Sequence, residues 1–203
     1  MLMKWKSIFF ISVAVFLQAC SKPQTKITTE EIHQKELWVR MLVETPAGTI
    51  EKYELNKTSG LLEMDSVNGK PRLIDYLGYP ANYGMIPKTI LPKNKGGDGD
   101  PLDIIAIGPP AERGSSIDCK VIGVLKLKDR GEQDDKLIAI SSNSSLKHIN
   151  SIHELQENYP GISEIIETWF THYKGKEKMI SSGYQDQKRA QEIYNMAKQS
   201  FTE

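Results

Sequence analysis

Residues 96–107, with the sequence GGDGDPLDIIAI, place three carboxylates within six positions, at Asp98, Asp100 and Asp103. A Gly-rich turn carries them and leads into an apolar, β-branched segment that is typical of a buried strand. Carboxylates this close repel one another, and a hard divalent cation with oxygen ligands would relieve the repulsion. The alternative is a solvated acidic turn, but Pro101 and the strand restrict where the carboxylates point. The stretch therefore predicts a metal site and leaves its chemistry open.

A second acidic turn, residues 128–136, lies between two further segments with the pattern of strands. This placement suggests that the second turn closes over the first, although a distance in space does not follow from sequence. Before both turns, residues 69–84 are too irregular for a helix. Their tyrosines can offer hydroxyls at fixed positions, although Tyr76 can equally serve only for packing. Arg72 supplies a planar fork that suits phosphate oxygens.

Strands come first in the chain and helices last. Apolar patterning predicts strands over 37–44, 50–55, 117–127 and 137–140, with a hairpin turn at 56–60. The odd-numbered residues of 117–127 should share one face. Apolar residues at spacings of three and four predict a helix from Ile162 to Lys174-Gly175 and a shorter helix over 190–201. The order indicates an α+β domain, with a mainly antiparallel sheet or barrel and helices on one side.

The N-terminus has the layout of a bacterial lipoprotein signal peptide. Two lysines precede an apolar run, residues 8–17, which is too short to span a bilayer comfortably and closes at Cys20 after a small residue. We expect residues 1–19 to be removed, Cys20 to be lipidated, and residues 20–35 to form a polar tether. The alternative is a buried apolar helix with an incidental cysteine. The pattern predicts an exported, membrane-anchored lipoprotein on the periplasmic or cell-surface side of a bacterium.

Composition sets further limits on the domain that we expect over residues 36–203. The 203-residue chain carries 26 basic and 26 acidic side chains, so no net field is available to hold nucleic acid or anionic lipid. A membrane would therefore be contacted only through the N-terminal lipid. Cys119, the other cysteine, lies in an alternating strand pattern and is expected to be a small core residue without a disulfide.

Six ordered blocks of this sequence resemble the soluble inorganic pyrophosphatases, a Mg-dependent family with an OB-like barrel. The resemblance covers roughly residues 39–174, and its most specific block is DGDPLD at 98–103. The other blocks are Glu44 before a proline turn, KYE at 52–54, YPANYG at 79–84, Asp129 with Asp134 and Lys136 after VIGVLK, and HYK at 172–174. The resemblance implies an α+β fold, an OB-like antiparallel β-barrel with helices packed at one side. It also implies a homo-oligomer, either a trimer or a hexamer.

Residue roles follow from the same resemblance. The implied Mg²⁺ ligands are Asp98, Asp103 and Asp134, with Asp129 for a further ion and Glu44 and Glu54 in the outer shell. Asp100 resembles the carboxylate that takes a proton from the attacking water. The implied phosphate-binding side chains are Lys52, Arg72, Tyr83, Lys136, Tyr173 and Lys174. Tyr79 resembles a tyrosine that supports the aspartate cluster.

Some of these assignments have competitors. A gapless alignment from the KYE block puts Ser66 where the family has an arginine, and Arg72 is chosen because it is the only arginine in the longer segment that follows. Asp135 is adjacent to Asp134, and the spacing to the other motif residues favours Asp134. Tyr173 lies on the apolar stripe of its helix, so packing alone is an alternative to phosphate contact. For Lys52 and Glu54, an exposed strand face is the alternative.

The implied reaction is the hydrolysis of pyrophosphate to two orthophosphates. Mg²⁺ would neutralise the substrate and acidify a water whose pKa in bulk is about 15.7. Two alternatives stay open: an enzyme for another phosphoanhydride, such as a short polyphosphate or a nucleotide, and a non-catalytic OB-like binding lipoprotein. All the acidic positions are filled, which argues against the second.

Overall fold

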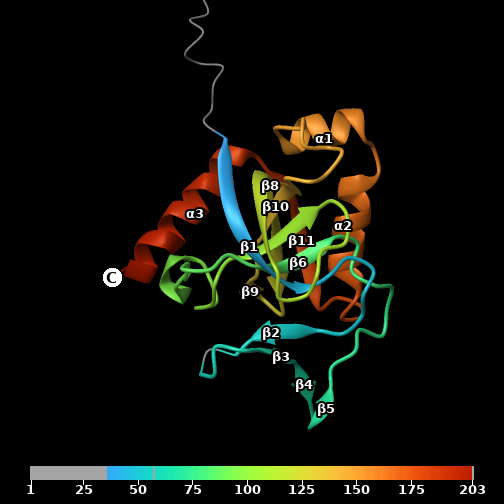
Figure 1. The fold of residues 1–203 in the computed structure, drawn as a ribbon, viewed down its shortest axis with the longest axis vertical. Helices are drawn as coiled ribbons and strands as arrows, with labels where there is room; N and C mark the ends of the chain where they lie inside the picture. The colour runs from blue at the N-terminus through green and yellow to red at the C-terminus, as the bar shows by residue number, and fades with distance from the viewer. Residues whose placement is uncertain (1–35, 57, 203) are drawn as a thin grey trace, which may run out of the picture. The chain divides into compact units, whose positions relative to one another are not determined.

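Seven strands form the main sheet of the structure, a computed structural model that describes residues 36–56 and 58–202 (Figure 1). These strands are β1 (Leu37–Thr45), β6 (Asn82–Met85), β7 (Asp103–Ile107), β8 (Ser116–Asp129), β9 (Glu132–Gln133), β10 (Lys136–Ser141) and β11 (Met179–Gln185). The short strands are β2 (Tyr53–Leu55), β3 (Leu62–Met64), β4 (Ser66–Val67) and β5 (Lys70–Pro71). The helices are α1 (Ile152–Asn158), α2 (Ile162–His172), α3 (Gln187–Thr202) and the 3₁₀ helix η2 (Lys93–Lys95). The predicted signal peptide, Cys20 and the tether lie outside the described residues.

Five strands close into a barrel. Their order is β1-β6-β7-β10-β8, and β8 pairs again with β1 to complete the ring. The predicted OB-like α+β class is confirmed, with one difference: β7 and β10 are parallel, while the other pairs are antiparallel. Ile104 lies opposite Leu137 in this parallel pair, so both strands begin at the same end of the barrel.

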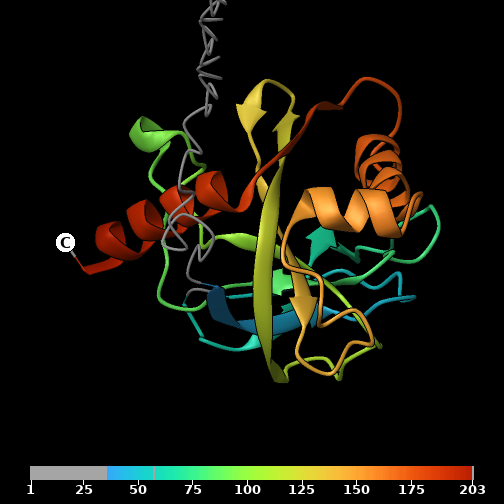
Figure 2. The same cartoon turned by 90° about the horizontal axis from the view of Figure 1, so that it is seen from above.

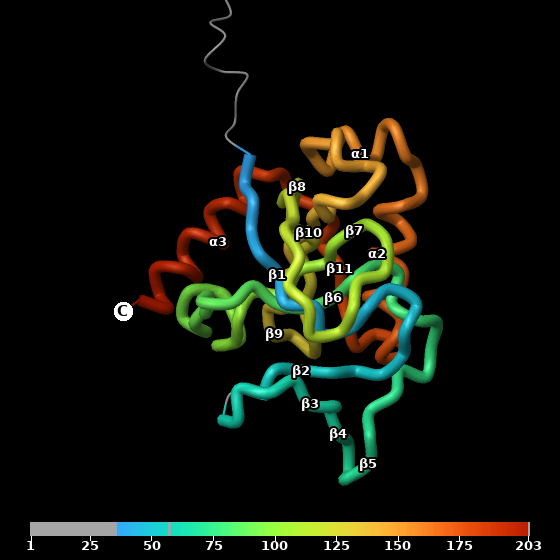
Figure 3. The backbone as a smooth tube through the Cα atoms, viewed as in Figure 1, coloured from blue at the N-terminus to red at the C-terminus, as the bar shows by residue number. Residues whose placement is uncertain are grey.

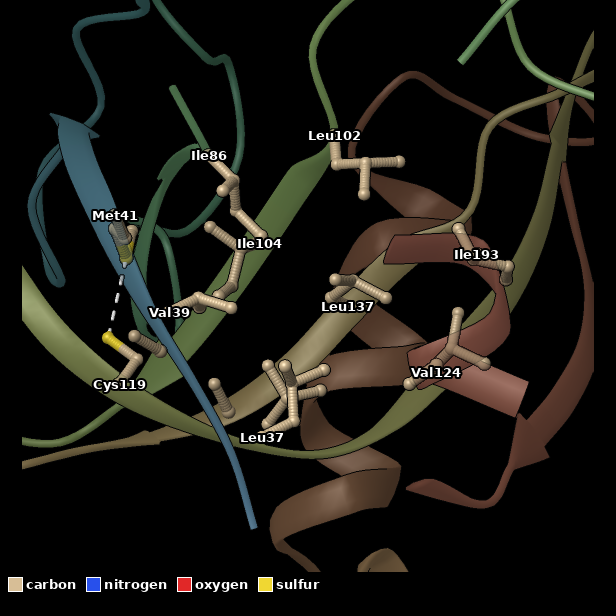
Figure 4. Packing of buried hydrophobic residues seen from close by; sticks show 14 of the residues in the cluster. Leu37, Val39, Met41, Ile86, Leu102, Ile104, Cys119, Val124, Leu137 and Ile193 are labelled. Atoms are coloured by element: carbon tan, nitrogen blue, oxygen red, sulfur yellow. Dashed lines mark hydrogen bonds between the residues drawn. The ribbon is translucent and has the colours of Figure 1, made fainter. Parts of the chain in front are cut away.

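The barrel strands bury side chains on both faces. One apolar cluster combines Met41, Ile104, Cys119 and Leu137 with Ile193 of α3 (Figure 4). A second cluster takes the alternate residues of β7 and β10 and packs them against α1 and α2. Burial on both faces explains why β7 is an unbroken apolar run after Asp103. Cys119 is fully buried, as predicted, and is a free thiol within the described part of the chain.

The helices lie on two sides of the barrel rather than on one. Figures 1 and 2 both show α3, in red, on the side opposite α1 and α2, in orange. The difference has a physical reason: α3 completes the inner cluster, whereas α1 and α2 cover the outer face of the strands. Among the described residues, no helix is long and apolar enough to cross a membrane.

The prediction that the odd residues of 117–127 share one face is wrong. Ile138 lies opposite Gly123 and Ala139 opposite Val121, so Ile122 is an extra residue in β8. Such a bulge exchanges the faces beyond it. Cys119 and Val121 therefore belong to the inner cluster, whereas Leu125 and Leu127 belong to the outer one.

Other elements were predicted incompletely. The hairpin over β2 and β3 is present, but β2 is shorter than expected and includes neither Ile50 nor Lys52. Helix α2 ends at His172, before the expected lysine and glycine. Strands β6 and β11 and helix α1 were not predicted.

Candidate active site

One cavity of about 280 Å³ is lined by every side chain to which the resemblance gives a metal or phosphate role. These residues are Glu44, Lys52, Glu54, Arg72, Tyr83, Asp98, Asp100, Asp103, Asp129, Asp134, Lys136, Tyr173 and Lys174. These residues come from segments that are far apart in the chain, as the colours of Figure 3 show. The segments include strands of the barrel and the arm, residues 52–72, which contains β2 to β5.

The two acidic turns meet through the parallel pair of strands. Because β7 and β10 start at the same end, Asp103 and Lys136 become neighbours. The Lys136 Nζ donates to Asp103 Oδ2 and, at 2.5 Å, to Asp134 Oδ1. The approach of the two turns that the sequence suggested is thus observed. Burial alone would lower the pKa of Lys136, but the two carboxylates raise it overall, so this lysine stays charged.

Burial destabilises the charged forms of the carboxylates around Lys136. Burial and the charge of Asp103 raise the pKa of Glu44 to about 7. Burial, joined by neighbouring carboxylates, also raises the pKa values of Asp98 and Asp134. Lys174 Nζ lies 2.7 Å from Asp129 Oδ2. The site is therefore short of positive charge.

The arm supplies Lys52 and Arg72. Lys52 is buried and forms an ion pair with Glu54, so the exposed-face alternative is wrong for Lys52. Burial and the charge of Arg72 lower the pKa of Lys52 to about 8. The Arg72 guanidinium lines the cavity, whereas Ser66 lies exposed on β4.

Asp65 is a contributor that sequence reasoning missed. Its Oδ2 lies 2.8 Å from Arg72 Nη1 and 3.9 Å from Lys52 Nζ. The backbone joins the same residues, because Lys52 N–H donates to Arg72 O at 3.1 Å and Arg72 N–H donates to Asp65 O at 2.7 Å. No local motif marks Asp65, because its contacts with Arg72 and Lys52 form only when the chain folds.

An aromatic group packs beside the cavity. Tyr79 is buried at 4.4 Å from the Trp169 ring centroid and 5.3 Å from that of Tyr83, and it does not line the cavity. Tyr173 stacks on Trp169 at 4.5 Å and also lines the cavity, so packing and contact with the site are compatible. Tyr76 lies outside the cavity and is partly exposed.

The second acidic turn separates its two adjacent aspartates. Asp134 lines the main cavity, whereas Asp135 forms an ion pair with Lys126. This geometry agrees with the choice of Asp134 over Asp135 as the candidate ligand.

The donor set fits a hard cation. Asp129 Oδ1 is buried without a hydrogen-bond partner in the described part of the chain, and carboxylate oxygens are the ligands that Mg²⁺ prefers. Within residues 36–56 and 58–202, no three His, Cys, Asp or Glu side chains are grouped closely enough to hold an ion as they stand. Ammonium groups lie between them: Lys136 is paired with Asp103 and Asp134, and Lys174 is paired with Asp129.

Comparisons with known proteins all identify inorganic pyrophosphatases as similar to this chain. A family profile described as inorganic pyrophosphatase matches residues 41–202. The inorganic pyrophosphatase of Buchnera aphidicola is 38% identical over 156 residues, which cover 74% of this chain and 82% of that protein. That of Xylella fastidiosa is 34% identical over 145 residues, covering 69% and 74%.

Solved structures with the same name have similar folds. The inorganic pyrophosphatase of Schistosoma japonicum superposes with a TM-score of 0.75 at 30% identity, covering 81% of this chain and 66% of that chain. That of Helicobacter pylori superposes with a TM-score of 0.69 at 26% identity, covering 83% and 95%.

Proposed function

Because the chain belongs to the inorganic pyrophosphatase family and hydrolyses pyrophosphate to orthophosphate, we propose that Mg²⁺ is its metal and that the cavity side chains perform the reaction. The observation that carries this proposal is Lys136, which is buried between a carboxylate of the first acidic turn and one of the second. Carboxylates for cations and ammonium groups for phosphate thus share one cavity.

The metal would be held by carboxylate oxygens. Asp98, Asp103 and Asp134 are the proposed principal ligands, Asp129 would hold a further ion, and Glu44 and Glu54 would contribute to the outer shell. When bound, Mg²⁺ supplies Lewis acidity toward phosphoryl oxygens and lowers the pKa of bound water. The raised pKa values of Asp98 and Asp134 support this, because a nearby cation would restore their charged forms.

Asp100 is the proposed general base. It is exposed at the edge of the cavity, and its backbone N–H donates to Asp98 Oδ1 at 2.9 Å, which holds the turn in shape. A carboxylate at this position can take the proton of the attacking water.

Six further side chains are proposed to hold the phosphates. Lys52, Arg72, Lys136 and Lys174 offer positive charge to the non-bridging oxygens. Burial, followed by the charge of Asp103, raises the pKa of Tyr83 well above its usual range, so its hydroxyl keeps a proton to donate. Tyr173 is proposed to add a second hydroxyl.

Phosphate release tests the proposed function. With Mg²⁺, the purified chain should release orthophosphate from pyrophosphate much faster than from ATP or tripolyphosphate, and EDTA should abolish the release. Faster release from ATP or tripolyphosphate would favour another phosphoanhydride substrate. Absence of release from all three would favour a binding protein.

We also propose that Cys20 is lipidated and anchors the enzyme outside the cytoplasm. The support is the sequence pattern that ends at Cys20. Radioactive palmitate should label the chain in cells and should not label Cys20→Ser. Equal labelling of both would contradict the anchor.

A homo-oligomer, trimer or hexamer, is proposed for the assembled enzyme. The support is the resemblance to the family alone. Light scattering after size exclusion should give three or six times the mass of one processed chain, and a monomer mass would contradict the proposal.

A further inference from the structure

A buried ion pair lies behind the second acidic turn. Asp135 is paired with Lys126 of β8, and their side chains are only 6% and 17% exposed. Asp135 Oδ1 also accepts from Leu127 N–H at 3.3 Å and from the Gln133 amide. The same Gln133 Nε2 donates to Leu127 O at 3.0 Å. The Asp135 carboxylate is thus fixed from several directions.

Asp134 is adjacent to Asp135, so the backbone links the orientations of the two side chains. The two residues connect β9 to β10 outside any helix or strand, and their carboxylates have different partners: Asp134 is paired with Lys136, and Asp135 with Lys126. Asp134 N–H donates to Leu127 O at 2.9 Å, so both residues are tied to the same part of β8. Asp134 lines the main cavity, whereas Asp135 and Lys126 do not and line a pocket beside Arg189 and Met196. Asp135 also lines a small pocket together with Asp98 and Asp134.

Stability alone is a poor explanation for this pair. Removing two charges from water is unfavourable, and apolar residues of similar volume often stabilise a fold as well or better. The contacts of the pair converge instead on the turn that carries Asp134. Groups that orient a metal ligand typically change metal affinity about 10 to 100-fold when they are removed.

We propose that Lys126 and Asp135 are positioning residues that hold Asp134 toward the cavity and thereby set the affinity for Mg²⁺. The inference rests on the proposed function, because it takes Asp134 as a ligand. Neither Lys126 nor Asp135 lines the main cavity, where the metal and the substrate are proposed to bind.

Calorimetric titration of Mg²⁺ into the full chain without pyrophosphate tests the proposal. Asp135→Ala and Lys126→Met should each raise the Mg²⁺ dissociation constant about tenfold. Turnover should return to within about twofold of wild type once Mg²⁺ is saturating, because the reacting groups are intact. Asp118→Asn is the matched control, since it breaks the exposed pair with Arg40 and should leave the titration unchanged.

A double variant separates positioning from stability. Lys126→Met combined with Asp135→Leu replaces the pair by apolar contacts and should keep or regain the melting temperature while Mg²⁺ binding stays weak. If Asp135→Ala does not fold, Asp135→Asn and the double variant give the same readout.

Wild-type Mg²⁺ affinity in the single variants, or recovery of affinity together with stability in the double variant, would overturn the positioning role. A wild-type chain that neither binds Mg²⁺ nor releases phosphate would overturn the proposed function itself, and this inference with it.

Discussion

Asp100 and Asp98 lie in one turn but have different surroundings. Asp98 is partly buried, with a raised pKa, whereas Asp100 is exposed at the cavity edge. Asp100→Asn should therefore lower turnover by ~10²-fold or more, because general-base losses are of that order. Calorimetry should show that Mg²⁺ binding is largely kept. Unchanged turnover in this variant would remove Asp100 from its role.

The burial of Cys119 affects both the pH dependence of stability and the reactivity of the thiol. Burial, followed by the charge of Asp118, raises the pKa of the thiol to about 12, against about 8.5 in an unfolded chain. Between these values the unfolded state binds fewer protons than the folded state, so this thiol lowers the free energy of unfolding as pH rises from about 8.5 and has no effect below it. In a Cys20→Ser chain at pH 8, a thiol reagent should react only after denaturant is added. Fast reaction of the folded chain would show that Cys119 is accessible.

The sequence predicted the members of the candidate site, mostly through the family resemblance, but it did not predict which of them are buried. Residue types and spacing singled out the carboxylates of the first acidic turn and Arg72, and the family resemblance supplied the other metal and phosphate residues that line the cavity. The burial of Lys52 was not readable, because a strand pattern that exposes Glu54 also exposes Lys52 until the rest of the arm covers it.

The close approach of β1 and β6 explains the glycine in YPANYG. A Cβ at Gly84 would lie 1.9 Å from Leu42 O and 3.0 Å from Glu44 N. Gly84→Ala must therefore separate the two strands and should cost about 1–3 kcal/mol, which is roughly 2–12 °C in melting temperature for a domain of this size. Circular dichroism on heating measures this.

Gly60→Ala is not a suitable control for Gly84→Ala, because Gly60 has a positive φ of 70°. Ala81→Gly, which removes a buried methyl without a clash, gives a comparison for simple loss of packing. An unchanged melting temperature for Gly84→Ala would contradict the tight contact.

The arm over β2 to β5 depends on Asp65. Asp65→Asn weakens the ion pairs to Arg72 and Lys52 and keeps the side-chain shape, so KM for pyrophosphate should rise about tenfold, or ~1.4 kcal/mol of binding. Glu63→Gln on the same hairpin is the control, because Glu63 contacts only Asn56 and Ser59 among its described side-chain partners. Equal KM values for the two variants would contradict the role of Asp65.

The apolar patterns predicted where strands and helices lie along the chain better than they predicted which face of a strand each side chain occupies. The apolar runs located β1, β8, β10 and α2, but the bulge at Ile122 is set by pairing with β10 and leaves no trace in the alternation. Strand β6 was missed because its glycine and proline neighbours are typical of loops, although tertiary contacts hold it extended.

The barrel as a whole makes the site. Closure through β1 and β8, together with the parallel pair β7 and β10, collects carboxylates and cations from distant segments. Neither pairing follows from local sequence, because both join strands that are separated along the chain. The family resemblance supplied the barrel, and physical reasoning from the residues supplied only the class of fold.

Anomalous diffraction from a crystal soaked in Mn²⁺, a stand-in for Mg²⁺, tests most directly whether the two acidic turns act together. At least one peak should lie about 2.2 Å from an oxygen of Asp98 or Asp103 and equally close to an oxygen of Asp134. Peaks that contact only one of the two turns, or no peak in the cavity, would contradict the shared site.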